Sequence, residues 1–205
     1  MNLDQIAGVA HEPENAPAGV VVLTHGAGGS RDSPLLQKVC DEWARRGWLA
    51  VRYNLPYRRR RPKGPPSGSA NADQAGVAEA VAVARTLADG PVIAGGHSYG
   101  GRMTSMAVAD RTVDVDVLML FSYPLHPPGK PERLRTEHLA HITTPTVFTH
   151  GSSDPFGTIA ELGAAAELVA ARTELVEVTG ARHDLGAKSL DVPRMAVDAA
   201  LRLLA

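Results

Sequence analysis

The sequence predicts an α/β protein with three layers (αβα), in which helices cover both faces of a mostly parallel sheet. Short β-branched apolar runs alternate with helical patterns along the chain, and these runs are continuous, as in strands buried on both faces. Right-handed crossovers between successive strands make a parallel sheet the expected arrangement. No repeat or linker divides the chain, so we expect a single domain over residues 1–205.

Each element is predicted from its own local pattern. GVVVLTH is the first strand, and six strands are expected in all, at 19–25, 48–54, 91–98, 115–124, 145–151 and 173–180. The opening run IAGVAHE (6–12) is a candidate for a seventh, short edge strand. Apolar residues at three-to-four spacing, often followed by glycine, predict the helices at 33–47, 72–90, 99–110, 157–172 and 193–204.

The loops after the strands hold the residues that carry chemistry. In a parallel sheet, the loops that leave the carboxyl ends of the strands line the functional crevice. The loop after 91–98 contains the pattern G-x-S-x-G, as Gly96-His97-Ser98-Tyr99-Gly100, between a strand and a helix. That context makes Ser98 a candidate nucleophile on a strained turn, whereas a plain glycine-rich turn is the alternative.

A nucleophilic serine needs a base and a carboxylate that orients the base. Asp154 follows the strand at 145–151 and His183 follows the strand at 173–180, in the chain order Ser, Asp, His. Asp184 is a rival acid, but it is the immediate neighbour of His183 in the chain and is poorly placed to meet its imidazole. We therefore expect a Ser98–His183–Asp154 triad.

The same chemistry needs two hydrogen-bond donors for an oxyanion. The backbone N–H of Tyr99, which follows the nucleophile, is one candidate. The loop HGAGG after the first strand supplies the other, for which we expect the N–H of Ala27, with His25 organising the loop.

The motifs HGAGG, GGHSYGGR, GSSDPFG and GARHD resemble those of the α/β-hydrolase superfamily from about residue 19 to the end of the chain. Within it, YNLPYRRRR, YPLHPPGKPE and GSSDPFG resemble segments of compact predicted hydrolases related to dienelactone hydrolase. Dienelactone hydrolases carry cysteine where this chain has Ser98, so their specific reaction is not implied. The resemblance implies lids between the fourth and fifth core strands, and here residues 122–144 suffice only for a short connection or flap.

The arginine run YRRRRPKGPPSG follows the second core strand, on the predicted crevice edge. Arginine suits the recognition of carboxylate or phosphate, so Arg58, Arg59 and Arg60, with Arg102 of the 99–110 helix, are candidate substrate-binding residues. A solvated surface loop is the equal alternative.

Composition argues against several classes of function. The formal net charge is −1, which argues against a nucleic-acid partner, and the apolar runs are too short to span a membrane. One cysteine, and no basic-apolar start, favour a cytoplasmic protein. No metal or cofactor is expected, because no ligand set or phosphate loop accompanies the histidines and glycines.

The sequence therefore predicts a serine hydrolase that cleaves an ester or thioester of a small or accessible acyl group, with an anionic substrate as one option. A non-catalytic α/β-hydrolase-like binding or scaffold module is the alternative. A monomer and a homodimer both fit the sequence.

Overall fold

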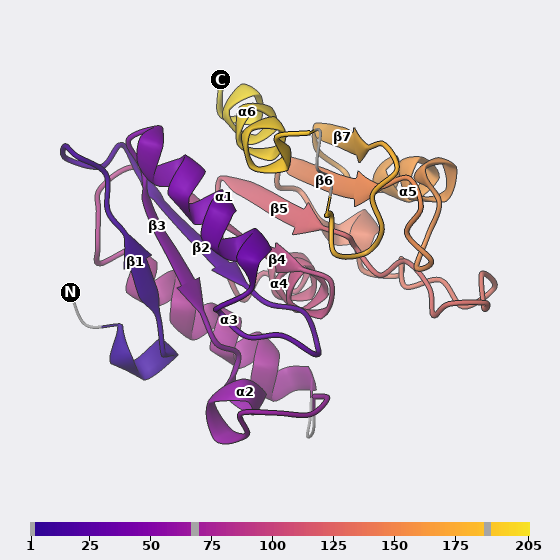
Figure 1. The fold of residues 1–205 in the computed structure, drawn as a ribbon, viewed down its shortest axis with the longest axis horizontal. Helices are drawn as coiled ribbons and strands as arrows, with labels where there is room; N and C mark the ends of the chain where they lie inside the picture. The colour runs from indigo at the N-terminus through magenta and orange to yellow at the C-terminus, as the bar shows by residue number, and fades with distance from the viewer. Residues whose placement is uncertain (1–2, 67–69, 187–189) are drawn as a thin grey trace.

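A seven-stranded sheet forms the centre of the protein in a computed structural model that describes residues 3–66, 70–186 and 190–205 (Figure 1). Its strand order is β1-β3-β2-β4-β5-β6-β7. The strands are β1 (Val9–His11), β2 (Val20–Thr24), β3 (Leu49–Tyr53), β4 (Val92–His97), β5 (Val117–Phe121), β6 (Thr146–Gly151) and β7 (Thr173–Val178). All pairs are parallel except β1 with β3, so the predicted fold class is confirmed, and the run IAGVAHE does provide an edge strand.

Helices cover both faces of the sheet (Figure 1). On one face, α1 (Pro34–Arg45) and α6 (Val192–Leu204) pack on the sheet and on each other. The other face carries α3 (Ala70–Ala84), α4 (Tyr99–Ala109) and α5 (Ile159–Ala166). Two apolar clusters fill the spaces between these layers and the sheet, as the predicted three-layer arrangement requires.

The residues of β2 show why the strand runs are apolar throughout. Val20 and Val22 point into the cluster beneath α3 and α4, whereas Val21 and Leu23 point into the cluster beneath α1 and α6. Successive side chains of a strand face opposite sides of the sheet, so a strand covered on both faces needs apolar residues at every position.

Three segments differ from the sequence-based expectation, and one of them is α3, which ends at Ala84 and not near Gly90. The start of the arginine run forms a short helix, α2 (Pro56–Arg60), where a loop was expected. Pro56 suits the first helical turn, and the carboxylate of Asp73 accepts a hydrogen bond from the N–H of Tyr57, so this turn is stabilised at its start. Helix α5 ends at Ala166, earlier than expected, and Ala170 beyond it donates its N–H to the carbonyl of Ile142.

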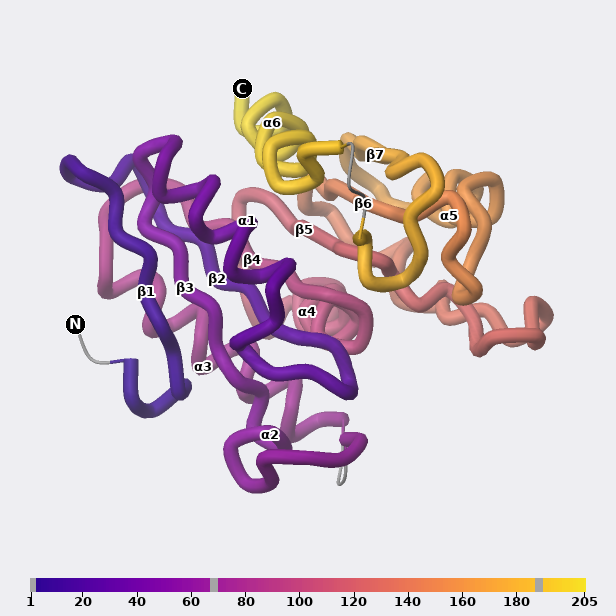
Figure 2. The backbone as a smooth tube through the Cα atoms, in the orientation of Figure 1, coloured from indigo at the N-terminus to yellow at the C-terminus, as the bar shows by residue number. Residues whose placement is uncertain are grey.

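The connection between β5 and β6 takes the place where a lid would stand. Figure 2 shows it running out at the edge of the molecule and back, and its helical content is the single turn η2 (Leu139–His141). The residues that the structure describes form no large lid. Across the described ranges, no helix is both long and apolar enough to cross a membrane.

Candidate active site

Ser98 lies at the turn between β4 and α4, and its backbone has a conformation that residues other than glycine rarely adopt. Its φ is 50° and its ψ is −116°. A Cβ added at Gly96 would lie 2.6 Å from the carbonyl oxygen of Thr24, and one at Gly100 would lie 2.5 Å from that of His25. Positions 96 and 100, two residues before and after Ser98, must therefore be glycine for the turn to close. The turn holds Ser98 at the amino end of α4 and at the carboxyl edge of the sheet.

The structure brings Ser98, His183 and Asp154 into one hydrogen-bonded chain. His183 Nε2 lies 2.8 Å from Ser98 Oγ, and His183 Nδ1 lies 2.8 Å from Asp154 Oδ2. A carboxylate only accepts hydrogen bonds, so Nδ1 carries the proton and Nε2 of the neutral imidazole faces the serine hydroxyl. Asp184, the rival acid, instead accepts a hydrogen bond from the N–H of Gly186.

The surroundings of Asp154 keep it ionised. Burial of its side chain disfavours the charge, but hydrogen bonds from His183 and from the N–H of Phe156 outweigh it and hold the pKa of Asp154 below its ordinary value. His150 lies beneath, with Nε2 3.8 Å from Asp154 Oδ2 and 2.9 Å from the carbonyl oxygen of Gly157. A lasting negative charge here favours the proton on Nδ1 of His183.

Two further side chains hold His183, and motif reasoning did not single them out. His97 Nε2 donates to the backbone carbonyl of His183 over 2.7 Å. The ring of Phe156 lies against the His183 ring, with centroids 4.2 Å apart and planes 31° apart. His97 lies next to Ser98 and Phe156 lies two residues after Asp154, so the signal in the sequence for both residues is their closeness to the predicted triad.

The loop after β2 brings the backbone of Ala27 to the same place. Ala27 and Tyr99 both line the pocket that contains Ser98. The carbonyl of Ala27 is turned away, where it accepts from the hydroxyl of Tyr57 at 2.8 Å and from the guanidinium of Arg58 at 3.1 Å. His25 is buried below, with Nδ1 2.9 Å from the carbonyl oxygen of Gly26 and Nε2 accepting from the N–H of Leu55.

The arginine run lies at the rim of the crevice, where its Pro66 lines the pocket around Ser98, but its arginine side chains do not reach that pocket. Arg58 is buried, and its guanidinium donates to four backbone carbonyls, those of Ala27, Gly29, Arg61 and Gly64. Arg59 donates to the carbonyl of Gln5 and pairs with Glu79 at 2.8 Å, and Arg60 is exposed. None of the three lines the pocket around Ser98. From the unpredicted helix α2, Arg58 and Arg59 are directed to partners outside the pocket, and Arg60 is directed to solvent.

A pocket of about 680 Å³ opens over Ser98 and His183. Its walls come from the loops after β2 and β7, from the start of α4 and from the β5–β6 connection, and they carry Ser98, His183, Arg102 and Arg135. Of the four arginines proposed from sequence, Arg102 alone reaches this pocket, and Arg135 is an addition. A larger hollow of about 990 Å³ beside the first turns of α1 and α6 does not include Ser98.

Solved structures of the same fold include several hydrolases. Dienelactone hydrolase from Anabaena variabilis superposes with a TM-score of 0.73 at 22% identity, over 95% of this chain and 90% of its own. Est1E from Butyrivibrio proteoclasticus, solved with ferulic acid, gives 0.75 at 16% identity, over 96% and 93%. An α/β serine hydrolase without a lid from Xanthomonas campestris gives 0.70 at 20% identity, over 95% and 88%. At these identities the likeness establishes the fold.

The family assignment comes from the sequence. The alpha/beta hydrolase domain family matches residues 17–194, which is most of the chain and includes all three residues of the Ser98–His183–Asp154 chain. The protein therefore belongs to the alpha/beta hydrolase family.

Proposed function

We propose that this protein is a serine hydrolase that cleaves a carboxylic ester or thioester through an acyl-enzyme on Ser98. One observation carries the proposal: Ser98 Oγ, His183 and Asp154 are joined by two hydrogen bonds of 2.8 Å, with the serine on a strained turn beside an open pocket. A structural serine has no need of this set of partners.

The first half of the reaction forms the acyl-enzyme. Nε2 of His183 takes the hydroxyl proton of Ser98 while Oγ attacks the carbonyl carbon of the substrate. The ionised Asp154 stabilises the imidazolium that results. The N–H groups of Ala27 and Tyr99 donate to the oxyanion, and His183 then gives its proton to the leaving alcohol or thiol as the carbon–oxygen or carbon–sulfur bond breaks.

The second half returns the enzyme to its starting state. A water molecule takes the place of the leaving group, His183 removes its proton, and the hydroxide attacks the acyl carbon. Collapse of the second tetrahedral intermediate releases the carboxylic acid and restores the proton to Ser98. The open rim of the pocket gives water a path to this carbon.

The shape of the site favours small or accessible acyl groups. The β5–β6 connection contributes Pro124 and Arg135 to one wall of the pocket and does not form a closed tunnel. The similar proteins are described as a dienelactone hydrolase and as a protein solved with ferulic acid, both of which involve compact substrates or ligands. Dienelactone hydrolases carry cysteine at the position of Ser98, so their specific reaction is not part of this proposal, and both esters and thioesters are candidate substrates.

A hydrolysis screen tests the proposal. Purified protein is assayed on nitrophenyl esters of short and long acyl chains, on thioesters and on lactones, with Ser98→Ala as the blank. We expect turnover of short-chain substrates by the natural sequence, and a rate no greater than the uncatalysed one for Ser98→Ala. If no substrate is turned over beyond that blank, the non-catalytic binding or scaffold role is favoured.

A further inference from the structure

Two arginines face the pocket without a carboxylate partner. Arg102 lies one turn into α4, where its N–H donates to the carbonyl of Ser98. Arg135 comes from the β5–β6 connection and lines the same pocket. Within the described ranges neither guanidinium forms an ion pair, although many other arginines of the chain do.

The two positive charges lie close enough to affect each other. Burial, followed by the charge of Arg102, lowers the pKa of Arg135 below its ordinary value. The charge of Arg102 also helps to lower the pKa of His138, after burial, to about 4. Like charges brought together in a partly buried place oppose each other, so a pair of this kind gains from an anion between or beside them.

The side chain of Arg102 has a donor that is still free. Its Nε is buried and has no hydrogen-bond partner among the described residues. A buried donor without a partner costs free energy, and the cost is removed when a ligand supplies an acceptor. The guanidinium fork matches the two oxygens of a carboxylate or phosphate.

Arg135 is held in place by its own backbone. Its N–H donates to the carbonyl of Leu125 at 2.8 Å, and its carbonyl accepts from the hydroxyl of Tyr123 at 2.6 Å. One guanidinium nitrogen, Nη1, donates to the carbonyl of Pro124 at 3.1 Å, which leaves the other donors of the fork available. The group is thus positioned before any ligand arrives, which lowers the entropy lost on binding.

We propose that Arg102 and Arg135 form a subsite for an oxyanionic group of the substrate, a carboxylate or a phosphate, beside the ester carbonyl that Ser98 attacks. The inference rests on the proposed hydrolase function and names its substrate class: esters that carry a negative charge near the scissile bond. It also replaces Arg58, Arg59 and Arg60 as the arginines that bind the anion.

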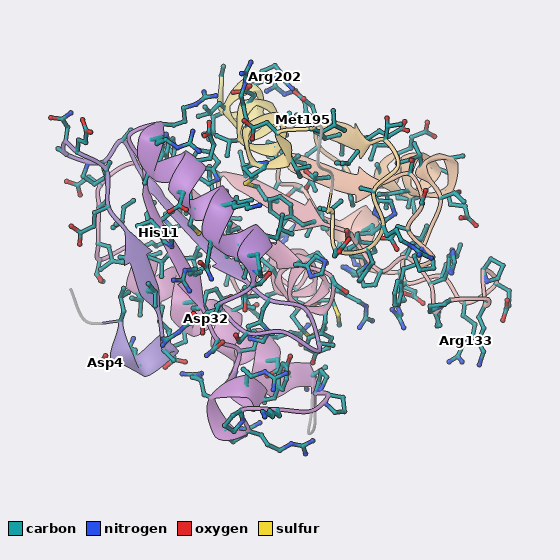
Figure 3. The ribbon with its side chains drawn as sticks, viewed as in Figure 1. Asp4, His11, Asp32, Arg133, Met195 and Arg202 are labelled. Atoms are coloured by element: carbon teal, nitrogen blue, oxygen red, sulfur yellow. The ribbon has the colours of Figure 1, made fainter. Side chains whose placement is uncertain are left out.

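The matched control is Arg133, two residues from Arg135 in the same connection. It is exposed and is not part of the pocket lining, and Figure 3 shows it at the outer tip of the connection, directed away from the body of the protein. Arg133→Gln therefore removes a charge from the same segment without removing a pocket-lining side chain. The charge of Arg133 is only a minor cause of the lowered pKa of Arg135, after burial and the charge of Arg102.

A binding measurement tests the subsite independently of catalysis. In the Ser98→Ala protein, calorimetry compares monomethyl glutarate, its neutral counterpart dimethyl glutarate, and a methyl ester that carries a phosphonate. We expect the better of the two anions to bind at least about tenfold more tightly than the neutral ester, and the difference to vanish with Arg102→Gln or Arg135→Gln. Arg133→Gln should preserve it.

Equal binding of charged and neutral esters, no measurable binding of either anion, or a preference that survives both arginine variants would overturn the proposal. The relative affinity for carboxylate and phosphonate says which oxyanion the subsite fits. Because Ser98→Ala cannot form an acyl-enzyme, failure of the hydrolase proposal leaves this test intact.

Kinetics supply the second readout. The ratio of kcat/KM for a nitrophenyl ester with a terminal carboxylate to that for an uncharged ester of equal length should fall about 10- to 100-fold in Arg135→Gln, the range expected for lost charge-assisted hydrogen bonds. Arg133→Gln should leave the ratio unchanged. An unchanged ratio in Arg135→Gln would contradict the subsite, whereas absence of turnover on both esters would contradict the hydrolase.

Discussion

The side chain of His97 donates a hydrogen bond from Nε2 to the backbone carbonyl oxygen of His183, at 2.7 Å. The bond joins the turn that presents Ser98 to the loop that carries its base, 86 positions further along the chain. The rings of His97 and His183 also lie near each other, with centroids 5.1 Å apart. We infer that His97 is a positioning residue that ties the turn of Ser98 to the loop of His183 in the proposed triad.

Replacement of His97 should misplace the base without removing any reacting group. We expect His97→Phe to lower kcat about 5- to 10-fold with little change in KM, because loss of one hydrogen bond costs about 1 kcal/mol. His97→Gln, whose amide can donate to the same carbonyl, should recover part of kcat. If the glutamine and phenylalanine variants are equally impaired, His97 has only a packing role.

Arg58 should stabilise the oxyanion loop, which is the loop HGAGG after β2 that carries the proposed oxyanion donor Ala27. Arg58→Met leaves four backbone carbonyls without this donor, including those of Ala27 and Gly29. We expect the free energy of unfolding to fall by about 2 kcal/mol or more, and kcat to fall on charged and uncharged esters alike. Urea unfolding and parallel kinetics check this, and a loss confined to anionic esters would show instead that Arg58 binds substrate.

The stability of the protein should depend on an added methyl group at one glycine beside the site and not at another. A Cβ at Gly100 would meet the carbonyl oxygen of His25 at 2.5 Å, whereas one at Gly28 would have no described atom within 4 Å beyond its immediate chain neighbours. We expect Gly100→Ala to lower the free energy of unfolding by about 1–3 kcal/mol, as overpacking does, and Gly28→Ala to leave it nearly unchanged. Equal stability of the two variants in urea would contradict the close packing of this turn.

The buried histidine of the oxyanion loop should make stability depend on pH. Burial, aided by the charges of Arg58 and His97, lowers the pKa of His25 to about 4, against 6.5 for an ordinary histidine. Between these values the unfolded chain binds the proton first, so stability is lost as the pH falls from 6.5 toward 4. In His25→Asn, the slope of unfolding free energy against pH in this window should fall by about 1.4 kcal/mol per pH unit. An unchanged slope would show that His25 takes up its proton in the folded protein.

Much of the fold could be predicted from the sequence, because parallel strands buried on both faces leave an unmistakable run of apolar residues. The edge on which each loop lies follows from strand direction alone, and Ser98, Asp154 and His183 could therefore be placed together before their distances were known. The short helix α2 could not be foreseen, because YRRRR has no apolar periodicity and its turn depends on a distant carboxylate, that of Asp73.

The fate of the arginines depends on contacts that local sequence does not contain. Arg58 and Arg135 are the same residue type in proline-rich connections, yet one donates to the carbonyls of its surroundings and the other lines the pocket. The two arginines differ because they lie in different connections: Arg58 lies in α2, which follows β3, whereas Arg135 lies between β5 and β6. His97 was missed for a related reason, since its partner lies on a loop brought near by the strand order.

Covalent labelling of Ser98 by a fluorophosphonate tests the central claim most directly, because the probe reacts with a serine only when a base activates it. We expect the folded natural sequence to be labelled once, with the adduct on the peptide that contains Ser98 when the digest is examined by mass spectrometry. Ser98→Ala should take up no label, and His183→Ala should react at least about 100-fold more slowly. Absence of labelling in the folded natural protein, or an adduct on a serine other than Ser98, would contradict the account.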